Sequence, residues 1–209
     1  MLKDLTTIPS RCGNCNEKIT LHAKDLENNI EYLDGKNKNF SYEIDFCTHC
    51  LYASLDIEKS TNMKTKLKVK SKKYKEILEN QDLEEGIRKI EAALFLTKDK
   101  EEEYILNMHA AWMLENLGLD SISYRRKANN IFEEEFKVKQ IPLKKVLENI
   151  DSKRQAGDFE EAIEKIENLK KDAIKANYKF KNEEIKFLEK EELWNKNYDL
   201  SPHSKEEIK

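Results

Sequence analysis

The sequence predicts a mainly α-helical protein with a small antiparallel β region near its N-terminus. Only five glycines and three prolines occur in 209 residues, which favours long helices joined by short loops. From about Leu67 onward the spacing of apolar residues changes from two, as in strands, to about 3.6, as in helices. Charged and hydrophobic residues each make up 38% of the chain, a balance typical of helices with one apolar stripe and broad solvated faces.

The chain contains four cysteines, arranged as the pairs Cys12-Gly-Asn-Cys15 and Cys47-Thr-His-Cys50. Two pairs of this spacing can surround one zinc ion with a tetrahedral shell of sulfur. The competing interpretations are disulfides or a redox site, but neither pair opens a helix in a thioredoxin-like setting. His22 and His49 could each replace a cysteine as a ligand, but four thiolates already complete the shell without them. We therefore expect one zinc ion on the four cysteines, and a structural role for it, because no coordination position stays open.

Three segments around the cysteine pairs have the composition of short strands: Lys18–Leu21, Ile30–Asp34 and Phe40–Phe46. Asp34-Gly35 is a turn signal between the last two. Two cysteine knuckles backed by a small sheet form a zinc ribbon, which we predict over residues 1–60. Asn16 follows the first knuckle and tolerates a left-handed backbone; Leu51 follows the second and tolerates it poorly, so we expect that turn to differ.

The rest of the chain repeats at a fixed spacing, with Asp82, Asp120 and Asp158 lying 38 residues apart. Positions four, eight and eleven after each aspartate share one helical face. These positions hold Gly86, Tyr124 and Ala162, then Ile90, Ala128 and Ile166, then Ala93, Ile131 and Leu169. The segment 156–163 resembles the turn and second helix of a tetratricopeptide repeat, although the usual period is 34. We predict tetratricopeptide-like helical hairpins over residues 61–200, and unrelated helical hairpins explain the pattern almost as well.

The C-terminal part of the sequence predicts one long amphipathic helix over residues 172–196. Ile174, Tyr178, Ile185 and Leu188 are expected to face inward. Residues 201–209 are expected to form a charged, frayed tail.

Two groups of residues are candidate partner contacts. The first is a lysine run made of Lys64, Lys66, Lys68, Lys70, Lys72, Lys73 and Lys75. Clustered cations beside a zinc ribbon suit nucleic-acid phosphates, whereas a helix with Leu67, Tyr74, Ile77 and Leu78 inward would simply expose them to solvent. The second group is Met108, Trp112 and Glu115, which could face a peptide; the alternative is that Trp112 belongs to the core.

Other functional classes find little support in the sequence. The net charge of −3 argues against nucleic-acid binding by the whole surface. No nucleophile–histidine–acid set and no phosphate-binding glycine loop is evident, so we expect neither an enzyme nor a small-molecule substrate. No apolar run approaches the ~18 residues of a membrane span, so we expect a cytoplasmic protein with reduced thiols.

Three motifs together resemble an uncharacterised bacterial family, the domain of unknown function 2225. They are Cys12-Gly-Asn-Cys15, Cys47-Thr-His-Cys50-Leu-Tyr-Ala-Ser54 and Ala111-Trp-Met-Leu-Glu-Asn-Leu-Gly118. The resemblance covers roughly residues 10–135 and departs at Leu51, where a glycine is expected. It implies cysteine pairs ahead of repeat-like helices, and no mechanism.

These observations favour a non-enzymatic, zinc-stabilised interaction or scaffold protein whose helical repeats bind a protein partner. The alternative is a nucleic-acid-binding accessory factor that uses the zinc ribbon and the run from Lys64 to Lys75.

Overall fold

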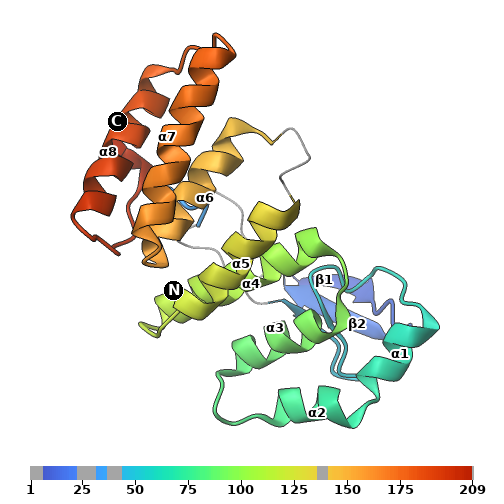
Figure 1. Cartoon of the computed structure of the whole chain (residues 1–209). Coiled ribbons are helices and arrows are strands. Elements are labelled where there is room, and N and C mark those ends of the chain that lie inside the picture. Colours follow the sequence, from blue (N-terminus) through green and yellow to red (C-terminus); the bar gives the residue numbers. More distant parts are fainter. Residues whose placement is uncertain (1–6, 23–31, 37–43, 136–140, 209) are drawn as a thin grey trace. The chain divides into compact units, whose positions relative to one another are not determined.

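The protein is mainly α-helical, as predicted, and its chain forms two compact units (Figure 1). A computed structural model describes residues 7–22, 32–36, 44–135 and 141–208. The first unit comprises residues 1–27 and 40–119, and the second comprises residues 28–39 and 120–209. The units thus divide at residue 119 rather than near residue 60, and a segment between the two cysteine pairs belongs to the second unit.

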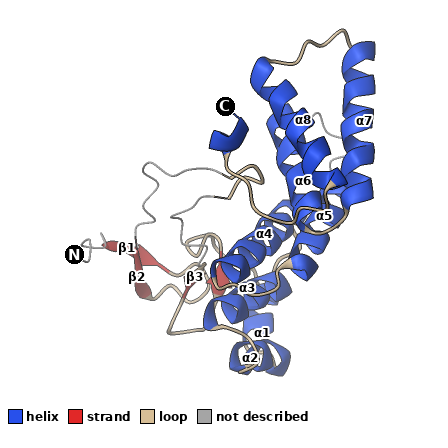
Figure 2. Ribbon diagram, turned by 90° about the vertical axis from the view of Figure 1, so that its left-hand side faces the viewer, coloured by secondary structure: helices blue, strands red, loops and turns tan. Residues whose placement is uncertain are grey.

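The first unit holds the strands, which form two antiparallel pairs in the described residues (Figure 2). Strand β1 (Thr7–Arg11) pairs with β2 (Lys18–His22), as expected for the segment that begins at Lys18. Strand β3 (Asp45–Phe46) pairs with β4 (Ala53–Ser54) across the second cysteine pair. Residues 40–43 of the predicted strand lie outside the described residues.

The predicted strand Ile30–Asp34 does not join these sheets in the described part of the chain. Residues 30 and 31 lie outside it, and Tyr32 forms an isolated bridge with Ser204 in the second unit. The expected turn is present, because Gly35 has a positive φ of 88° and the backbone N–H of Lys36 donates to Asp34.

The described part of the first unit also contains the helices α1 (Met63–Val69), α2 (Lys72–Glu79), α3 (Glu85–Leu96) and α4 (Lys100–Asn116). The lysine run spans two short helices instead of one, because the Ser71 hydroxyl accepts from the backbone N–H of Tyr74 and begins α2. Leu67 is 63% exposed, contrary to expectation, whereas Tyr74 is fully buried.

The second unit contains α5 (Ile122–Glu135), α6 (Leu143–Gln155), α7 (Phe159–Lys175), α8 (Asn182–Lys196) and the short 3₁₀ helix η1 (Lys205–Ile208). Its core joins Ile150 of α6, Ile166 of α7 and Leu188 of α8. Leu33 packs into the same core from the segment between the cysteine pairs. The fully buried Asp34 forms an ion pair with the fully buried Arg125 of α5 at 2.7 Å.

The 38-residue pattern marks the buried sides of three helices, as predicted. Ile90 in α3, Ala128 in α5 and Ile166 in α7 are equivalent in the pattern, and each is fully buried. Helices that follow one another within a unit pack together, and α6 also packs on α8. This arrangement is a set of helical hairpins; a tetratricopeptide stacking remains a prediction.

The predicted helix over residues 172–196 is interrupted. Asn177 adopts a left-handed backbone, with φ of 52°, immediately after α7. The backbone N–H of Tyr178 donates to the carbonyl of Ala173, and that of Asn177 to Ile174, which is the pattern of a Schellman motif. Three of the four residues expected to face inward are exposed: Ile174 near the end of α7, Tyr178 in the connection and Ile185 in α8. Leu188 is buried as expected.

The segment expected to be a frayed tail instead packs on the second unit as far as residue 208. The Arg154 side chain donates to the carbonyls of Asp199 and Ser201. The ring of His203 stacks on that of Trp194, with centroids 3.7 Å apart. The backbone carbonyl of His203 accepts from the backbone N–H of Leu33. Buried partners, which local composition does not reveal, hold this charged segment in place.

Within the described part of the chain, no helix combines the length and the apolar character that crossing a bilayer requires.

Candidate metal centre

The two cysteine pairs form turns with the same backbone geometry. The carbonyl of Cys12 accepts from the N–H of Asn16 at 2.7 Å, and the carbonyl of Cys47 accepts from the N–H of Leu51 at 2.7 Å. Asn16 and Leu51 have φ values of 66° and 65°. The expectation that the second turn differs was therefore wrong: Leu51 adopts the left-handed backbone despite a cost of roughly 1–2 kcal/mol for a residue with a Cβ.

The four cysteine sulfurs converge on one point, with all four Sγ atoms within 4.8 Å of one another. Sγ of Cys12 lies 3.7 Å from that of Cys50, and Sγ of Cys15 lies 3.7 Å from that of Cys47. A disulfide requires about 2.05 Å, so these are free thiols.

These distances fit a tetrahedral metal ion. Four sulfurs at about 2.3 Å from a central ion are separated by roughly 3.8 Å, because a tetrahedron's edge is about 1.63 times its centre-to-corner distance. The structure thus brings together Cys12, Cys15, Cys47 and Cys50, as predicted from their spacing. Among the described residues the cluster contains no histidine, so His22 and His49 are not part of it.

The environment of the thiols shifts their pKa values in both directions. Burial raises the pKa of Cys12, and it raises the pKa of Cys50 to about 12. Burial acts in the same direction on Cys47, but hydrogen bonds from the backbone N–H groups of Cys50 and His49 outweigh it and lower the pKa of Cys47. A metal ion at this centre would have to displace the protons of the two thiols whose pKa is raised.

Asn14 supports the sulfurs from within the first knuckle. Its side-chain amide donates to Sγ of Cys50 at 3.3 Å, and its backbone N–H donates to Sγ of Cys12 at 3.4 Å. The hydroxyl of Thr61 donates to the side-chain carbonyl of Asn14 at 2.8 Å and fixes its orientation. Sequence reasoning missed both residues; an amide between two cysteines was the available signal, whereas Thr61 is 47 residues away.

Gly13 lets a loop pass directly over the first knuckle. Its N–H donates to the carbonyl of Ile57 at 2.7 Å, and its carbonyl accepts from the N–H of Thr61 at 3.2 Å. A Cβ at Gly13 would lie 2.1 Å from the carbonyl oxygen of Lys59, which is closer than any real contact. The position therefore requires glycine for steric reasons.

The match to a protein family covers this centre. A family model described as "Uncharacterized protein conserved in bacteria (DUF2225)" matches residues 15–151, more than half of the chain. The chain belongs to this family. The match begins at Cys15, so three of the four clustered cysteines lie inside it and Cys12 lies just before it. No curated protein and no solved structure matches the chain.

The DUF2225 match also covers the other candidate contact residues, and the structure places them in different surroundings. Met108 is 2% exposed, which contradicts a role in contacting a peptide. Trp112 and Glu115 are half-buried, and the Trp112 ring lies 5.9 Å from that of His109. The period of the helix indicated which face carries Met108, but not that this face is covered.

The lysine run does not form one continuous face. Lys68 is half-buried and donates to the carbonyl of Phe95 at 2.7 Å. Lys72 forms an exposed ion pair with Glu76 at 3.6 Å. Exposed members of the run are Lys64, Lys70, Lys72, Lys73 and Lys75.

Proposed function

We propose that this protein is a non-enzymatic, zinc-stabilised interaction protein whose helical units bind a protein partner. The observation that carries the proposal is the closed set of four thiols: the chain supplies every position of a tetrahedral ion. Catalytic zinc sites keep a position open for water or substrate. A metal at this centre would therefore stabilise the fold and would not take part in catalysis.

Zinc is the metal that the donor set favours. Soft thiolates in tetrahedral geometry select zinc or an iron–sulfur centre, and four cysteines in two pairs are the common structural zinc arrangement. Free thiols at this distance also suit a reducing compartment, which supports a cytoplasmic location.

The ion would hold together elements that have little core of their own. The sheets in this region are two-stranded, and an isolated pair of strands is marginally stable at best. Zinc binding supplies about 10–16 kcal/mol in small zinc modules, which is enough to order the knuckles against α2.

The outer face of α1 is the surface that best suits a partner. Met63 and Leu67 are 71% and 63% exposed, and they lie one turn apart on the same face. Lys66 and Lys70 share this face at the neighbouring positions. Two apolar anchors flanked by cations would fit a partner segment with apolar residues bordered by Asp or Glu.

The metal is tested by elemental analysis of the purified protein. We expect one zinc per chain in the wild type and loss of zinc with Cys47→Ser. A metal-free, fully folded wild-type protein would contradict the proposal.

The partner is tested by affinity purification from the native host. We expect a protein retained in a stoichiometric amount by the wild type and by the control Ile174→Glu, but lost with Met63→Glu/Leu67→Glu. Ile174 is 80% exposed on the other unit, which makes it a matched control. Retention of the same proteins by all three, or of none above background, would refute the proposal.

A second candidate function is nucleic-acid binding, which the exposed lysines of α1 and α2 favour. Binding of DNA or RNA that weakens steeply with salt, and that is lost with Lys70→Glu/Lys73→Glu/Lys75→Glu, would support it. Binding that is absent or independent of salt would exclude it.

A further inference from the structure

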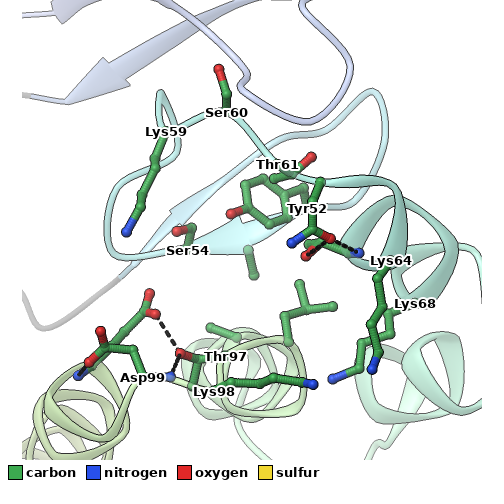
Figure 3. Close-up of a pocket in the computed structure, with 16 residues that line it drawn as sticks. Tyr52, Ser54, Lys59, Ser60, Thr61, Lys64, Lys68, Thr97, Lys98 and Asp99 are labelled. Carbon is green, nitrogen blue, oxygen red and sulfur yellow. Dashed lines mark hydrogen bonds between the residues drawn. The ribbon is translucent and has the colours of Figure 1, made fainter.

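A cavity of about 270 Å³ lies in the first unit, away from the sulfur cluster (Figure 3). Residues of β4, of the loop before α1, of α1 itself and of the α3–α4 connection line it. None of the four cysteines is among them. Its volume is slightly below the range of ligand pockets, about 300–1,000 Å³, so it suits a small ligand.

Three lysines converge on one side of this cavity. Lys64 and Lys68 lie one turn apart on α1, and Lys98 reaches toward them from the loop between α3 and α4 (Figure 3). The approach of like charges is unfavourable unless an anion lies between them. The contact with Lys64, followed by its charge, lowers the pKa of Lys98.

The nearby carboxylates serve other groups. Asp99 accepts from the N–H groups of Glu101 and Glu102 at 2.9 and 3.0 Å and so caps α4. Glu102 accepts from the hydroxyl of Thr97. Within the residues that the structure describes, no ion pair neutralises Lys64 or Lys98.

Three hydroxyl groups of the lining are also committed as donors. Ser54 donates to the carbonyl of Asp56, Thr61 to Asn14, and Thr65 to Asn62. The ammonium groups are the charged donors that the lining offers to a ligand. Lys68 uses one of its three protons on the carbonyl of Phe95 and keeps two.

The other walls are less polar. Ala53, Ala93, Leu96 and the ring of Tyr52 line the cavity beside the lysines. An inorganic anion at the lysines would leave this apolar part empty, whereas an organic group attached to the anion would fill it.

We propose that this cavity binds a small organic phosphate, with its phosphoryl group at Lys64, Lys68 and Lys98 and its organic part against Ala93 and Leu96. A phosphomonoester carries about −1.5 to −2 charges at neutral pH, which suits three cations at one point. A nucleic-acid backbone, with one charge per phosphate, instead needs cations spread along a track. The proposal is independent of the protein partner, so either can fail alone.

The test is a titration of the zinc-loaded, full-length protein at constant ionic strength, with inorganic phosphate and phenyl phosphate as the probes. Amide chemical shifts near Lys98 and Thr65 report binding. We expect saturable chemical-shift changes with both phosphate probes and tighter binding of phenyl phosphate than of inorganic phosphate. Chloride should cause no saturable change. Lys64→Gln/Lys98→Gln should weaken binding by about tenfold or more, the equivalent of ~1.4 kcal/mol.

The matched control is Lys70→Gln/Lys75→Gln, which removes the same charge from exposed positions of the run outside this cavity. It should change the dissociation constant by less than about twofold. Lys64→Arg/Lys98→Arg should retain phosphate binding, which separates lost charge from lost folding. Equal weakening in both glutamine variants would overturn the proposal. So would displacement of phosphate by a single-stranded oligonucleotide whose own binding depends on Lys70 and Lys75.

Discussion

The phenolic hydroxyl of Tyr74 donates a hydrogen bond to the carbonyl oxygen of Leu51 at 2.7 Å, linking α2 to the end of the second knuckle. The same hydroxyl accepts from the backbone N–H of Ala53 at 3.1 Å. Tyr74 is fully buried, and burial raises its pKa, so the hydroxyl stays protonated and able to donate. One side chain thus satisfies two backbone groups and holds Leu51 in its left-handed conformation.

Tyr74→Phe should destabilise the first unit by about 1–3 kcal/mol, because it leaves the buried N–H of Ala53 and the part-buried carbonyl of Leu51 without their partner. Urea unfolding of the zinc-loaded protein measures this change. Tyr178→Phe is the matched control: its hydroxyl is exposed and contacts Glu184, so its effect should stay within about 0.5 kcal/mol. Equal stability of wild type and Tyr74→Phe would contradict the role of this hydrogen bond.

Leu51→Asn should stabilise the protein by up to about 1 kcal/mol, because asparagine tolerates the left-handed backbone better than leucine. Leu51 is 38% exposed, so little packing is lost. Leu193→Asn, at a 52% exposed position within α8, should instead destabilise slightly through lower helix propensity. Thermal unfolding compares the two variants with the wild type. A lower melting temperature for Leu51→Asn would show that the left-handed backbone at Leu51 is not strained.

Gly13→Ala should cost about 3 kcal/mol or more and reduce zinc content, because the added methyl group meets the backbone of Lys59. Gly118→Ala separates this clash from backbone strain. Gly118 has φ of 69° but open space around its Cβ position, so the substitution should cost only about 1 kcal/mol. Unfolding experiments and zinc analysis measure both variants. Similar losses of stability and zinc in the two would show that the backbone around Lys59 moves and relieves the clash at residue 13.

Glu191→Gln should weaken a pH dependence of the stability of the second unit. Glu191, Asp151 and Arg154 are fully buried together, and Arg154 lies 3.3 Å from Glu191. Burial, followed by the charge of Asp151, raises the pKa of Glu191 well above its ordinary value of 4.5. A raised pKa in the folded state means that the stability contributed by protonated Glu191 is complete below about pH 4.5 and is lost as pH rises through the folded value.

Amide exchange in α6 and α8 between about pH 5 and 8 measures this dependence, whose slope is at most about 1.36 kcal/mol per pH unit for one proton. The slope should become clearly shallower in Glu191→Gln, with a remainder from Asp151, whose pKa burial also raises. It should stay unchanged in Glu189→Gln, an exposed position on the same helix. A slope unchanged in Glu191→Gln would assign the dependence to another group.

Local signals in the sequence predicted most of the metal centre and much of the helical packing. The spacing of the cysteines was sufficient for the cluster, and the 38-residue pattern for the buried positions Ile90, Ala128 and Ile166. Leu51 was misjudged because a hydrogen bond from Tyr74, 23 residues away, stabilises a backbone that leucine disfavours. Asn177 was the available sign that α7 ends early, since asparagine readily adopts the left-handed backbone.

The ion pair between Asp34 and Arg125 joins parts of the chain that are 91 residues apart. A fragment starting at residue 120 would lack Asp34 and Leu33, and an interior guanidinium deprived of its counter-ion costs about 3–5 kcal/mol. The second unit therefore cannot be produced on its own, or moved to another protein, as one continuous stretch of sequence. During synthesis, the segment that contains Leu33 and Asp34 leaves the ribosome long before α5, the helix that carries Arg125.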